Sequence, residues 1–371
     1  MIATLVFGAG LLAGGLAMAR PRYLPPASSD ELHPVPAISV VIPARNAATT
    51  IAPLLASCAR FGTRAMEVIV VDDASRDATG ELAAAYGAIV LRLDGDPPNG
   101  WTGKAYACHR GAALATAPVL LFLDADVTIR AGALDRLLAA HAAHGGLLSV
   151  QPFHRTQRPY EVLSAMCNVV AIMGSGAFAP WRSIRKPAAF GPCLLMSSSD
   201  YTEVGGHAGV RGEVVEDVAL ARRFHSRGLP VTVFTGWGAV EFRMYPGGPR
   251  QLANGWTKNL ASGAKLVDPV ASAIAVWWVS ACIAFTAMAV RLAAVGAPHS
   301  IVLALVCWTI VAAQLRWMWR RVGSFGWFAA LLHPIATGAF VALFVRSAWA
   351  TFVRRRVRWS GRPIALTGRS S

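Results

Sequence analysis

The sequence carries little charge. Asp, Glu, Lys and Arg make up 15% of the 371 residues, whereas soluble domains carry about 25%. Hydrophobic residues reach 54%, and the mean hydropathy is +0.45. This composition excludes an ordinary soluble enzyme and a largely disordered chain.

Paired cysteines are also lacking. The six cysteines are scattered and form no Cys-x-x-Cys pair, so neither a disulfide framework nor a zinc ribbon is expected. A Walker A loop is missing too, because NGWTGK (99–104) has neither the spaced glycines nor the GK[ST] ending.

Acidic residues are outnumbered, 20 against 35 Lys and Arg, which gives a net charge of +15. Such a charge suits nucleic acid or the anionic inner leaflet of a membrane. The apolar runs lie at both ends of the chain. The first, Ile2 to Ala19, is followed by Arg20-Pro21-Arg22. It predicts a membrane anchor over 1–22 with the following domain in the cytoplasm. A signal peptide is the alternative, although no basic residues precede the run.

Three more apolar stretches follow near the C-terminus, at 267–290, 298–315 and 327–352. The sequences RWMWRRVGSFG and FVRRRVRWSGR flank them, and basic clusters with tryptophans are typical of membrane interfaces. This placement favours a membrane partner over nucleic acid. An even number of spans would put both basic clusters on the cytoplasmic side, whereas three stretches are present. His333-Pro334 interrupts the last of them. That stretch is therefore either spanning or re-entrant, which leaves two to three spans over 267–353 and a basic tail of cytoplasmic type over 354–371.

The middle of the chain has the pattern of an α/β domain. Branched apolar runs at 38–43, 67–73, 88–93 and 119–126 predict parallel strands buried on both faces. Ala- and Leu-rich helices are expected between them, at about 48–60, 77–86, 104–116 and 132–143. In such open sheets, ligands bind beyond the carboxyl ends of the strands.

Carboxylates follow two of these strands. Asp124-Ala125-Asp126 suits a divalent cation held against a diphosphate, because hard cations take oxygen ligands; a solvated turn is the alternative. Asp72 and Asp73 suit the base or ribose of a nucleotide, and here the alternative is a helix cap, with Ser75 or Asp77 capping the next helix.

Two further segments are candidates for binding a phosphate and for removing a proton. Lys104 and the helix start beside it suit phosphates, the alternative being an exposed loop. Glu216 and Asp217 begin a helical stretch, where a carboxylate suits a general base or a simple cap.

Three further candidates lie elsewhere in the chain. The amphipathic stretch at 251–266 is predicted to lie on the membrane surface and bring Trp256 and Lys258 to the site, with plain anchoring as the alternative. His207 is either near the site or an ordinary loop histidine. Residues 160–190 are unusually apolar and are either core or lipid-facing.

Taken in order, SVVIPARN, VIVVDDASRDAT, WTGKAYACHRGA, FLDADV, FGPCLLMSSSDYTEVGGH and VEDVALARR resemble family 2 glycosyltransferases. The resemblance covers about residues 38–265. Within the family, GGLLSVQPFHRTQRPYEVLS and FRMYPGG resemble membrane-bound 4,4′-diaponeurosporenoate glycosyltransferases, and WTGK is shared with hopanoid-associated ones.

The resemblance implies an inverting GT-A, Rossmann-like α/β domain over 38–250, after a linker at 23–37, with Mg²⁺ or Mn²⁺ as the cofactor. By position, it implies that the donor's nucleoside contacts Pro43, Ala44, Arg45, Asn46 and Asp72 or Asp73. Lys104 would lie near the diphosphate, Asp124 near the ribose and metal, and Asp126 on the metal. Asp217 would be the base.

Processive members carry a QxxRW motif, whereas this chain reads Gln251-Leu-Ala-Asn-Gly-Trp256. We therefore expect transfer of one sugar, from a UDP-sugar first of all, to a lipid-soluble carboxylate or hydroxyl such as that of a carotenoid or terpenoid. A polyprenyl-phosphate glycosyltransferase is the alternative within this chemistry, and a non-catalytic module of an export complex is the alternative outside it. A transporter is disfavoured, because the apolar segments carry no acidic residues.

Overall fold

The computed structural model describes residues 2–26, 36–60, 66–181, 187–264, 268–352, 356–359 and 362–365. The chain divides into two compact units. The sheet unit comprises Arg22–Phe153 and Pro187–Arg243, and the helical unit comprises Met1–Pro21, His154–Lys186 and Met244–Ser371. The chain thus leaves the sheet unit after Phe153 and re-enters it at Pro187.

The sheet unit is built on a seven-stranded sheet in the order β3-β2-β1-β4-β8-β6-β9. Its strands are β1 Ile38–Ala44, β2 Met66–Asp73, β3 Ile89–Leu93, β4 Val119–Leu123, β6 Leu147–Gln151, β8 Cys193–Ser197 and β9 Val231–Thr235. Strands β3, β2, β1 and β4 run parallel, so their carboxyl ends meet at one edge. A small sheet joins β5 Val127–Ile129, β10 Val240–Phe242 and β7 Phe153–His154.

The helices of this unit connect the strands. They are α2 Ile51–Ala59, α3 Thr79–Ala85, α4 Gly103–Leu114, α5 Ala133–His144, α7 Ser198–Glu203, α8 Glu216–Ser226 and the 3₁₀ turn η2 His207–Val210. The four strands and four helices predicted from the sequence are confirmed within a few residues. One expectation was wrong: β3 is an edge strand, and its Ile89 is 50% exposed, so it is not buried on both faces. Strand β8 is antiparallel to β4 and β6, so the sheet is mixed.

Helix α4 lies very close to the sheet at Gly111. A β-carbon at this position would stand 2.4 Å from Val41 of β1 and 2.9 Å from Val71 of β2. Only glycine permits this approach, and the approach fixes the start of α4, with Lys104, relative to the carboxyl ends of the same two strands.

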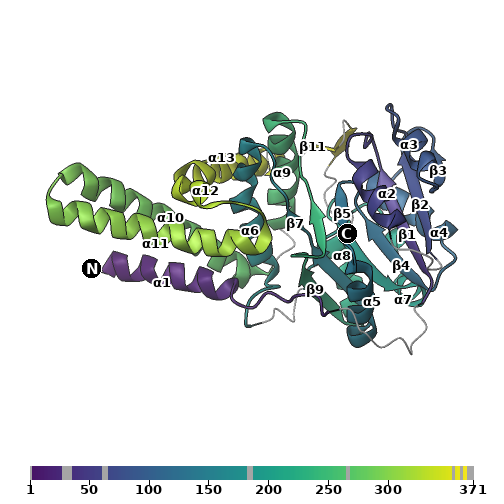
Figure 1. The fold of residues 1–371 in the computed structure, drawn as a ribbon, viewed down its shortest axis with the longest axis horizontal. Coiled ribbons are helices and arrows are strands. Elements are labelled where there is room, and N and C mark those ends of the chain that lie inside the picture. The colour runs from purple at the N-terminus through teal and green to yellow at the C-terminus, as the bar shows by residue number, and fades with distance from the viewer. Residues whose placement is uncertain are drawn as a thin grey trace. The chain divides into compact units, whose positions relative to one another are not determined.

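The helical unit contains α1 Ile2–Ala17, η1 Pro159–Ser164, α6 Ala165–Ser175, α9 Pro249–Ala264, α10 Pro269–Val295, α11 Pro298–Val322, α12 Trp327–Leu331 and α13 His333–Phe352, together with the hairpin β11 Arg356–Trp359 and β12 Arg362–Ala365. In Figure 1, α10 and α11 form a long hairpin and α1 runs beside them. The apolar segment at 160–190 is core over α6, where Met166, Val169 and Ile172 are fully buried, whereas Trp181 is 42% exposed. Residues 182–186 lie outside the described residues.

Helix α1 is held to α10 and α11 by close packing and by a polar bridge. A β-carbon on Gly14 would lie 2.1 Å from the indole of Trp278. The Trp278 Nε1 donates to Gln314 Oε1 at 3.0 Å, and Gln314 Nε2 donates to the carbonyl of Leu11 at 2.6 Å. Helix α1 is therefore an integral part of the helical unit.

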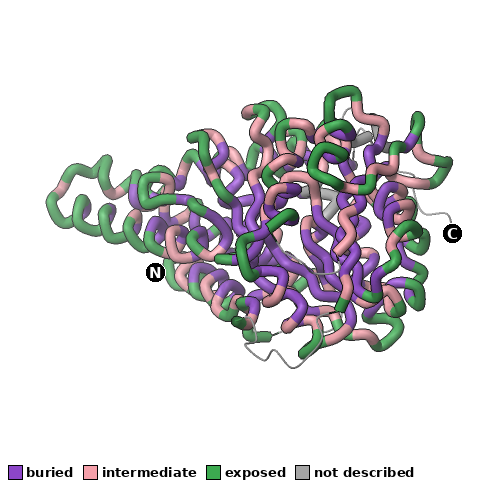
Figure 2. Tube along the Cα trace, turned by 45° about the vertical axis from the view of Figure 1, so that its right-hand side comes forward, coloured by how far each residue is buried: buried purple, intermediate pink, exposed green. Residues whose placement is uncertain are grey.

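Three described helices are long and apolar enough to span a membrane: α10, α11 and residues 333–351 of α13, with mean hydropathies of 2.0, 1.8 and 1.2. Helix α1 is shorter than the full span that the sequence predicted. The predicted interruption at His333-Pro334 is confirmed, since α12 ends at Leu331 and α13 begins at His333. Figure 2 shows exposed residues along much of the α10–α11 hairpin, and these include Val276, Val302 and Leu305.

Candidate active site

A lysine lies at the centre of a cluster of carboxylates at the carboxyl edge of the sheet. The Lys104 Nζ is 2.7 Å from Asp124 Oδ1 and 3.1 Å from Glu216 Oε1. Burial disfavours the charged amine, but the charges of Asp124 and Glu216 outweigh it and hold the pKa of Lys104 well above its usual value. The amine is therefore a fixed positive charge joining the segment after β4 to the start of α8.

Local structure orients this lysine. It is the second residue of α4, whose N-cap Thr102 accepts a hydrogen bond from the Ala105 N–H with its side chain. The predicted alternative of an exposed loop is wrong for Lys104, since its side chain is only 19% exposed. Its ammonium and the first turn of α4 both provide positive potential at one place.

Asp217, beside Glu216 in the first turn of α8, is the second charged element. Its Oδ2 accepts the backbone N–H of Gly191 at 2.6 Å, and its Oδ1 accepts that of Val218 at 2.9 Å. Burial, and after it the charge of Glu216, raises the pKa of Asp217 to about 6. The group is mostly a carboxylate at neutral pH, with a basicity suited to taking a proton.

Gly191 is a site residue that the sequence reasoning missed. A β-carbon there would stand 3.0 Å from Asp217 Oδ2 and 3.1 Å from Lys104 Nζ. The next residue, Pro192, accepts the N–H of Asp124 through its carbonyl at 3.0 Å. The loop before β8 thus ties the two acidic segments together. In the sequence, the only indication for Gly191 was its place in the FGPCLLM stretch. This stretch lies between the apolar segment at 160–190 and β8, a strand that the sequence did not predict.

Asp124 and Asp126 lie between β4 and β5. Burial, and after it the charge of Asp124, raises the pKa of Asp126 to about 7. Two neighbouring carboxylates of this kind are a donor pair that suits a hard divalent cation. Within the described ranges, no group of three or more His, Cys, Asp or Glu side chains is placed to hold a metal. This pair therefore fits a cation that takes its other ligands from water and a diphosphate, as Mg²⁺ commonly does.

The loops after β1 and β2 are interlocked. The Asn46 N–H donates to Ser75 Oγ at 2.9 Å, and Asn46 Oδ1 accepts the N–H of Arg76 at 2.9 Å. Asn46 and Ala74 both have positive φ, 50° and 51°. Asn tolerates this conformation, whereas for Ala it is uncommon, so these bonds hold the second loop in a disfavoured backbone geometry.

The part of the site at the ends of β1 and β2 also contains Arg45, Asp72 and Asp73. The Arg45 Nη1 donates to the carbonyl of Asp73 at 2.7 Å and lies 3.6 Å from its Oδ2. Asp72 Oδ1 accepts the N–H of Ser75 at 3.0 Å, so it has a turn-forming role. The expected helix cap is not found, because the N-cap residue of α3 is Ala78 and no side chain caps it; Asp77, one residue earlier, accepts the N–H of Thr79 through its Oδ1 at 3.2 Å.

Pro43 and Ala44 are the last two residues of β1. They pair with Val71 and Asp72 of β2, which places them directly before the interlocked loops.

His207 is a buried histidine close enough to Lys104 and Glu216 for their charges to act on it, and an acceptor contact there stays a prediction. Its side chain is buried with the residue 1% exposed, and its Nδ1 lies 3.0 Å from the hydroxyl of Tyr201. The ring contacts Phe122 of β4 at 4.9 Å between centroids. Burial lowers the pKa of His207 to about 4, so it is neutral.

The two acceptor candidates of the helical unit differ in exposure. Trp256 is buried on α9, and its Nε1 donates to Ser164 Oγ at 2.9 Å, so it is a packing residue rather than a plain interfacial anchor. Lys258 is partly exposed two residues later. The predicted amphipathic helix at 251–266 corresponds to α9, which begins at Pro249.

Comparison with known proteins extends over the whole chain. The model of Glycosyl transferase family 2 matches residues 39–199. The 4,4′-diaponeurosporenoate glycosyltransferase of Staphylococcus haemolyticus (strain JCSC1435) is 34% identical over 365 residues, covering 97% of this chain and 96% of that protein. The protein of the same name from Staphylococcus aureus (strain MRSA252) is 34% identical over 370 residues, covering 99% and 98%.

A solved structure shares the fold. The mannosyltransferase PcManGT from Pyrobaculum calidifontis, in complex with GDP-Man and Mn²⁺, is similar with a TM-score of 0.54 at 17% identity. The similarity covers 95% of this chain and 98% of that chain, so it includes the elements of both units.

Proposed function

The chain belongs to glycosyltransferase family 2 and has its GT-A fold, and on this premise we propose that it transfers one sugar from a nucleotide-diphosphate sugar to a lipid-soluble acceptor. The acceptor carries a carboxylate or a hydroxyl, and a carotenoid or terpenoid carboxylate is the first choice. Relatives that are a third identical over nearly their whole length are named for a carotenoid acid, 4,4′-diaponeurosporenoate. The donor is first of all a UDP-sugar.

The observation that carries the proposal is the charge arrangement around Lys104. A lysine, two carboxylates and a helix start meet at the carboxyl edge of the sheet, where open α/β sheets bind their ligands. The ammonium supports the diphosphate of the donor. Arg45 and Asn46, with Asp72 and Asp73 after the neighbouring strand, form the nucleoside end of the same edge.

Asp124 and Asp126 would hold Mg²⁺ or Mn²⁺. Such a cation, when bound, neutralises the negative charge that develops on the leaving diphosphate.

Asp217 is the base in this proposal when the acceptor is a hydroxyl. Its carboxylate takes the proton as the acceptor oxygen bonds to the anomeric carbon and the bond to the diphosphate breaks. A carboxylate acceptor is already ionised and needs no base, and its product is a glycosyl ester. One displacement inverts the anomeric carbon in both cases.

The helical unit supports a reaction at a membrane. Three described helices have the length and hydropathy of spans, and they expose large apolar side chains, which is the surface expected against lipid. The basic clusters beside these helices support a cytoplasmic catalytic domain.

The test is a donor and acceptor screen on protein reconstituted in nanodiscs. UDP-, GDP- and TDP-sugars with Mn²⁺ are offered with three apolar acceptors, namely a polyene carboxylic acid, its alcohol and a polyprenyl phosphate. Products are identified by mass spectrometry. A glycosyl ester or a glycoside that the Asp126→Asn variant does not form supports the proposal. Product only from the phosphate would assign the alternative acceptor class, and donor binding without product from any acceptor would indicate a non-catalytic module.

A further inference from the structure

The basic residues of the helical unit far outnumber its acidic ones. Residues 244–371 contain 14 of the chain's 35 Lys and Arg but a single acidic residue, Asp268. Arginines on α9 to α13 therefore have few carboxylates of their own to pair with. Arginines that lack carboxylate partners and lie beside apolar spans are expected to bind an anion from outside the chain.

Arg346 carries such a charge on α13. It lies inside the span-length segment His333–Thr351. Its Nη2 donates to Asn254 Oδ1 of α9 at 2.7 Å, and among the described residues no carboxylate lies within ion-pair distance of Arg346 or Arg250. An ionisable side chain within a span is costly and marks a functional site by default.

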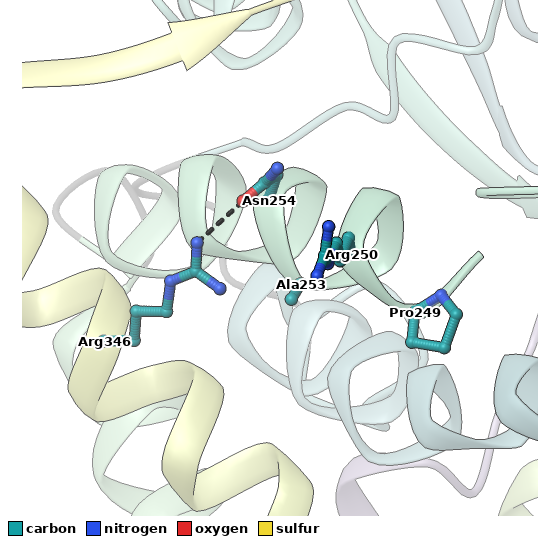
Figure 3. A pocket seen from close by; sticks show the side chains of 5 residues that line it. All are labelled: Pro249, Arg250, Ala253, Asn254 and Arg346. Carbon is teal, nitrogen blue, oxygen red and sulfur yellow. Dashed lines mark hydrogen bonds between the residues drawn. The ribbon is translucent and has the colours of Figure 1, made fainter. Parts of the chain in front are cut away.

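The two arginines line one open pocket of about 370 Å³, together with Pro249, Ala253 and Asn254. Figure 3 shows the guanidinium group of Arg346 reaching from α13 toward Asn254, with Arg250 one turn closer to the start of α9. Cations from two helices thus reach the same space, and Pro249 and Ala253 give it an apolar wall. This volume is in the range of small-ligand pockets.

We propose that this pocket binds the anionic head of a lipid, a carboxylate or a phosphate, through Arg346 and Arg250. A guanidinium group presents paired N–H donors that match the oxygens of either group. The inference rests on the proposed function in so far as the lipid is the acceptor itself; an anionic phospholipid of the surrounding bilayer offers the same chemistry.

The experiment counts lipids retained by the full-length protein in native mass spectrometry, with oleate and dioleoylphosphatidylglycerol as separate probes. No donor sugar is present, so the result does not depend on whether transfer occurs. Loss of charge-assisted hydrogen bonds predicts at least about tenfold weaker retention of the bound probe in Arg346→Gln and Arg250→Gln. Retention of oleate against a phosphatidylglycerol background identifies an acceptor-type site, and retention of phosphatidylglycerol alone identifies a phospholipid site.

A control variant separates binding at the pocket from the general positive charge of the helical unit. Arg291→Gln removes an exposed arginine of α10 that does not line the pocket, and it is expected to retain the probe like the wild type. Equal retention of both probes by the wild type, Arg346→Gln, Arg250→Gln and Arg291→Gln would overturn the proposal.

Discussion

Gly191 and Asp217 are in direct contact although they are 26 residues apart: the glycine N–H donates to the aspartate Oδ2, and the glycine Cα faces the same oxygen. The carboxylate therefore has a fixed orientation and little room on that side. This relationship makes Gly191 a sensitive position for testing the site.

Replacing Gly191 with Ala is expected to displace the carboxylate of Asp217 or the ammonium of Lys104. The backbone of Gly191 does not need a positive φ, so Ala fits the main chain. Misplacing a reacting group by about 1 Å costs up to about a hundredfold in rate, so we expect a ten- to hundredfold lower kcat/KM. Gly338→Ala, on an exposed face of α13 with no atom within 4 Å of the added carbon, is the matched control. Equal activity of both variants would contradict the placement.

Asp217→Asn is expected to affect hydroxyl acceptors far more than carboxylate acceptors. General-base catalysis contributes about 10²- to 10⁴-fold, and that factor is lost only where a proton must be removed. With a pKa of about 6, wild-type transfer to a hydroxyl should fall about tenfold per pH unit below this value, because the base becomes protonated. The pH profile of kcat/KM with both acceptors is the measurement. A carboxylate acceptor that suffers the same loss would argue against the base role.

The same pKa predicts a stability change. Because burial raises the folded-state value above that of the unfolded chain, the folded state holds the proton more tightly. Stability from this group is fully present below the unfolded value of about 4 and is lost as the pH rises to about 6. The Asn variant should therefore melt at the same temperature as the wild type or higher at pH 8. A lower melting temperature there would mean that the ionised group stabilises the fold.

Asp126→Asn is expected to weaken divalent-cation binding by about tenfold or more, as the loss of support at a metal site typically does. The direct readout is Mn²⁺ titration by electron paramagnetic resonance in the presence of the nucleoside diphosphate. Asp135→Asn, on the neighbouring helix α5, leaves the pair intact and is the control. Unchanged Mn²⁺ affinity in Asp126→Asn would remove this residue from the proposed ligand set.

Gly14→Ala tests the packing of α1. The added carbon would lie 2.1 Å from the Trp278 ring, whereas at Gly8, on the same helix, it would meet nothing within 4 Å. Overpacking of this kind costs about 1–3 kcal/mol. We expect a lower melting temperature in detergent for Gly14→Ala and no change for Gly8→Ala. Two identical melting curves would show that the contact does not contribute to stability.

The strands and helices of the sheet unit could be predicted because they depend on local patterns. The run at 119–123 is apolar at every position and is buried at every position. Lys104, Asp124 and Asp217 could be singled out for a related reason, since each stands where a strand ends or a helix begins.

Other features depend on contacts between distant residues, which no local pattern carries. The role of Gly191 comes from a side chain 26 positions away. Similarly, the burial of His207 depends on its contact with the ring of Phe122 in β4, which is far away in the sequence. The assignment of His154–Lys186 to the helical unit depends on its contacts with segments that are distant in the sequence.

The packing of α1 also has a consequence for biosynthesis. Gly14 leaves the ribosome roughly 260 residues before Trp278, which corresponds to tens of seconds at ordinary rates of translation. During that interval the indole that fills the gap beside Gly14, and the Gln314 amide that bonds to Leu11, do not yet exist. The first helix must therefore remain without these contacts until the end of the chain provides its partners.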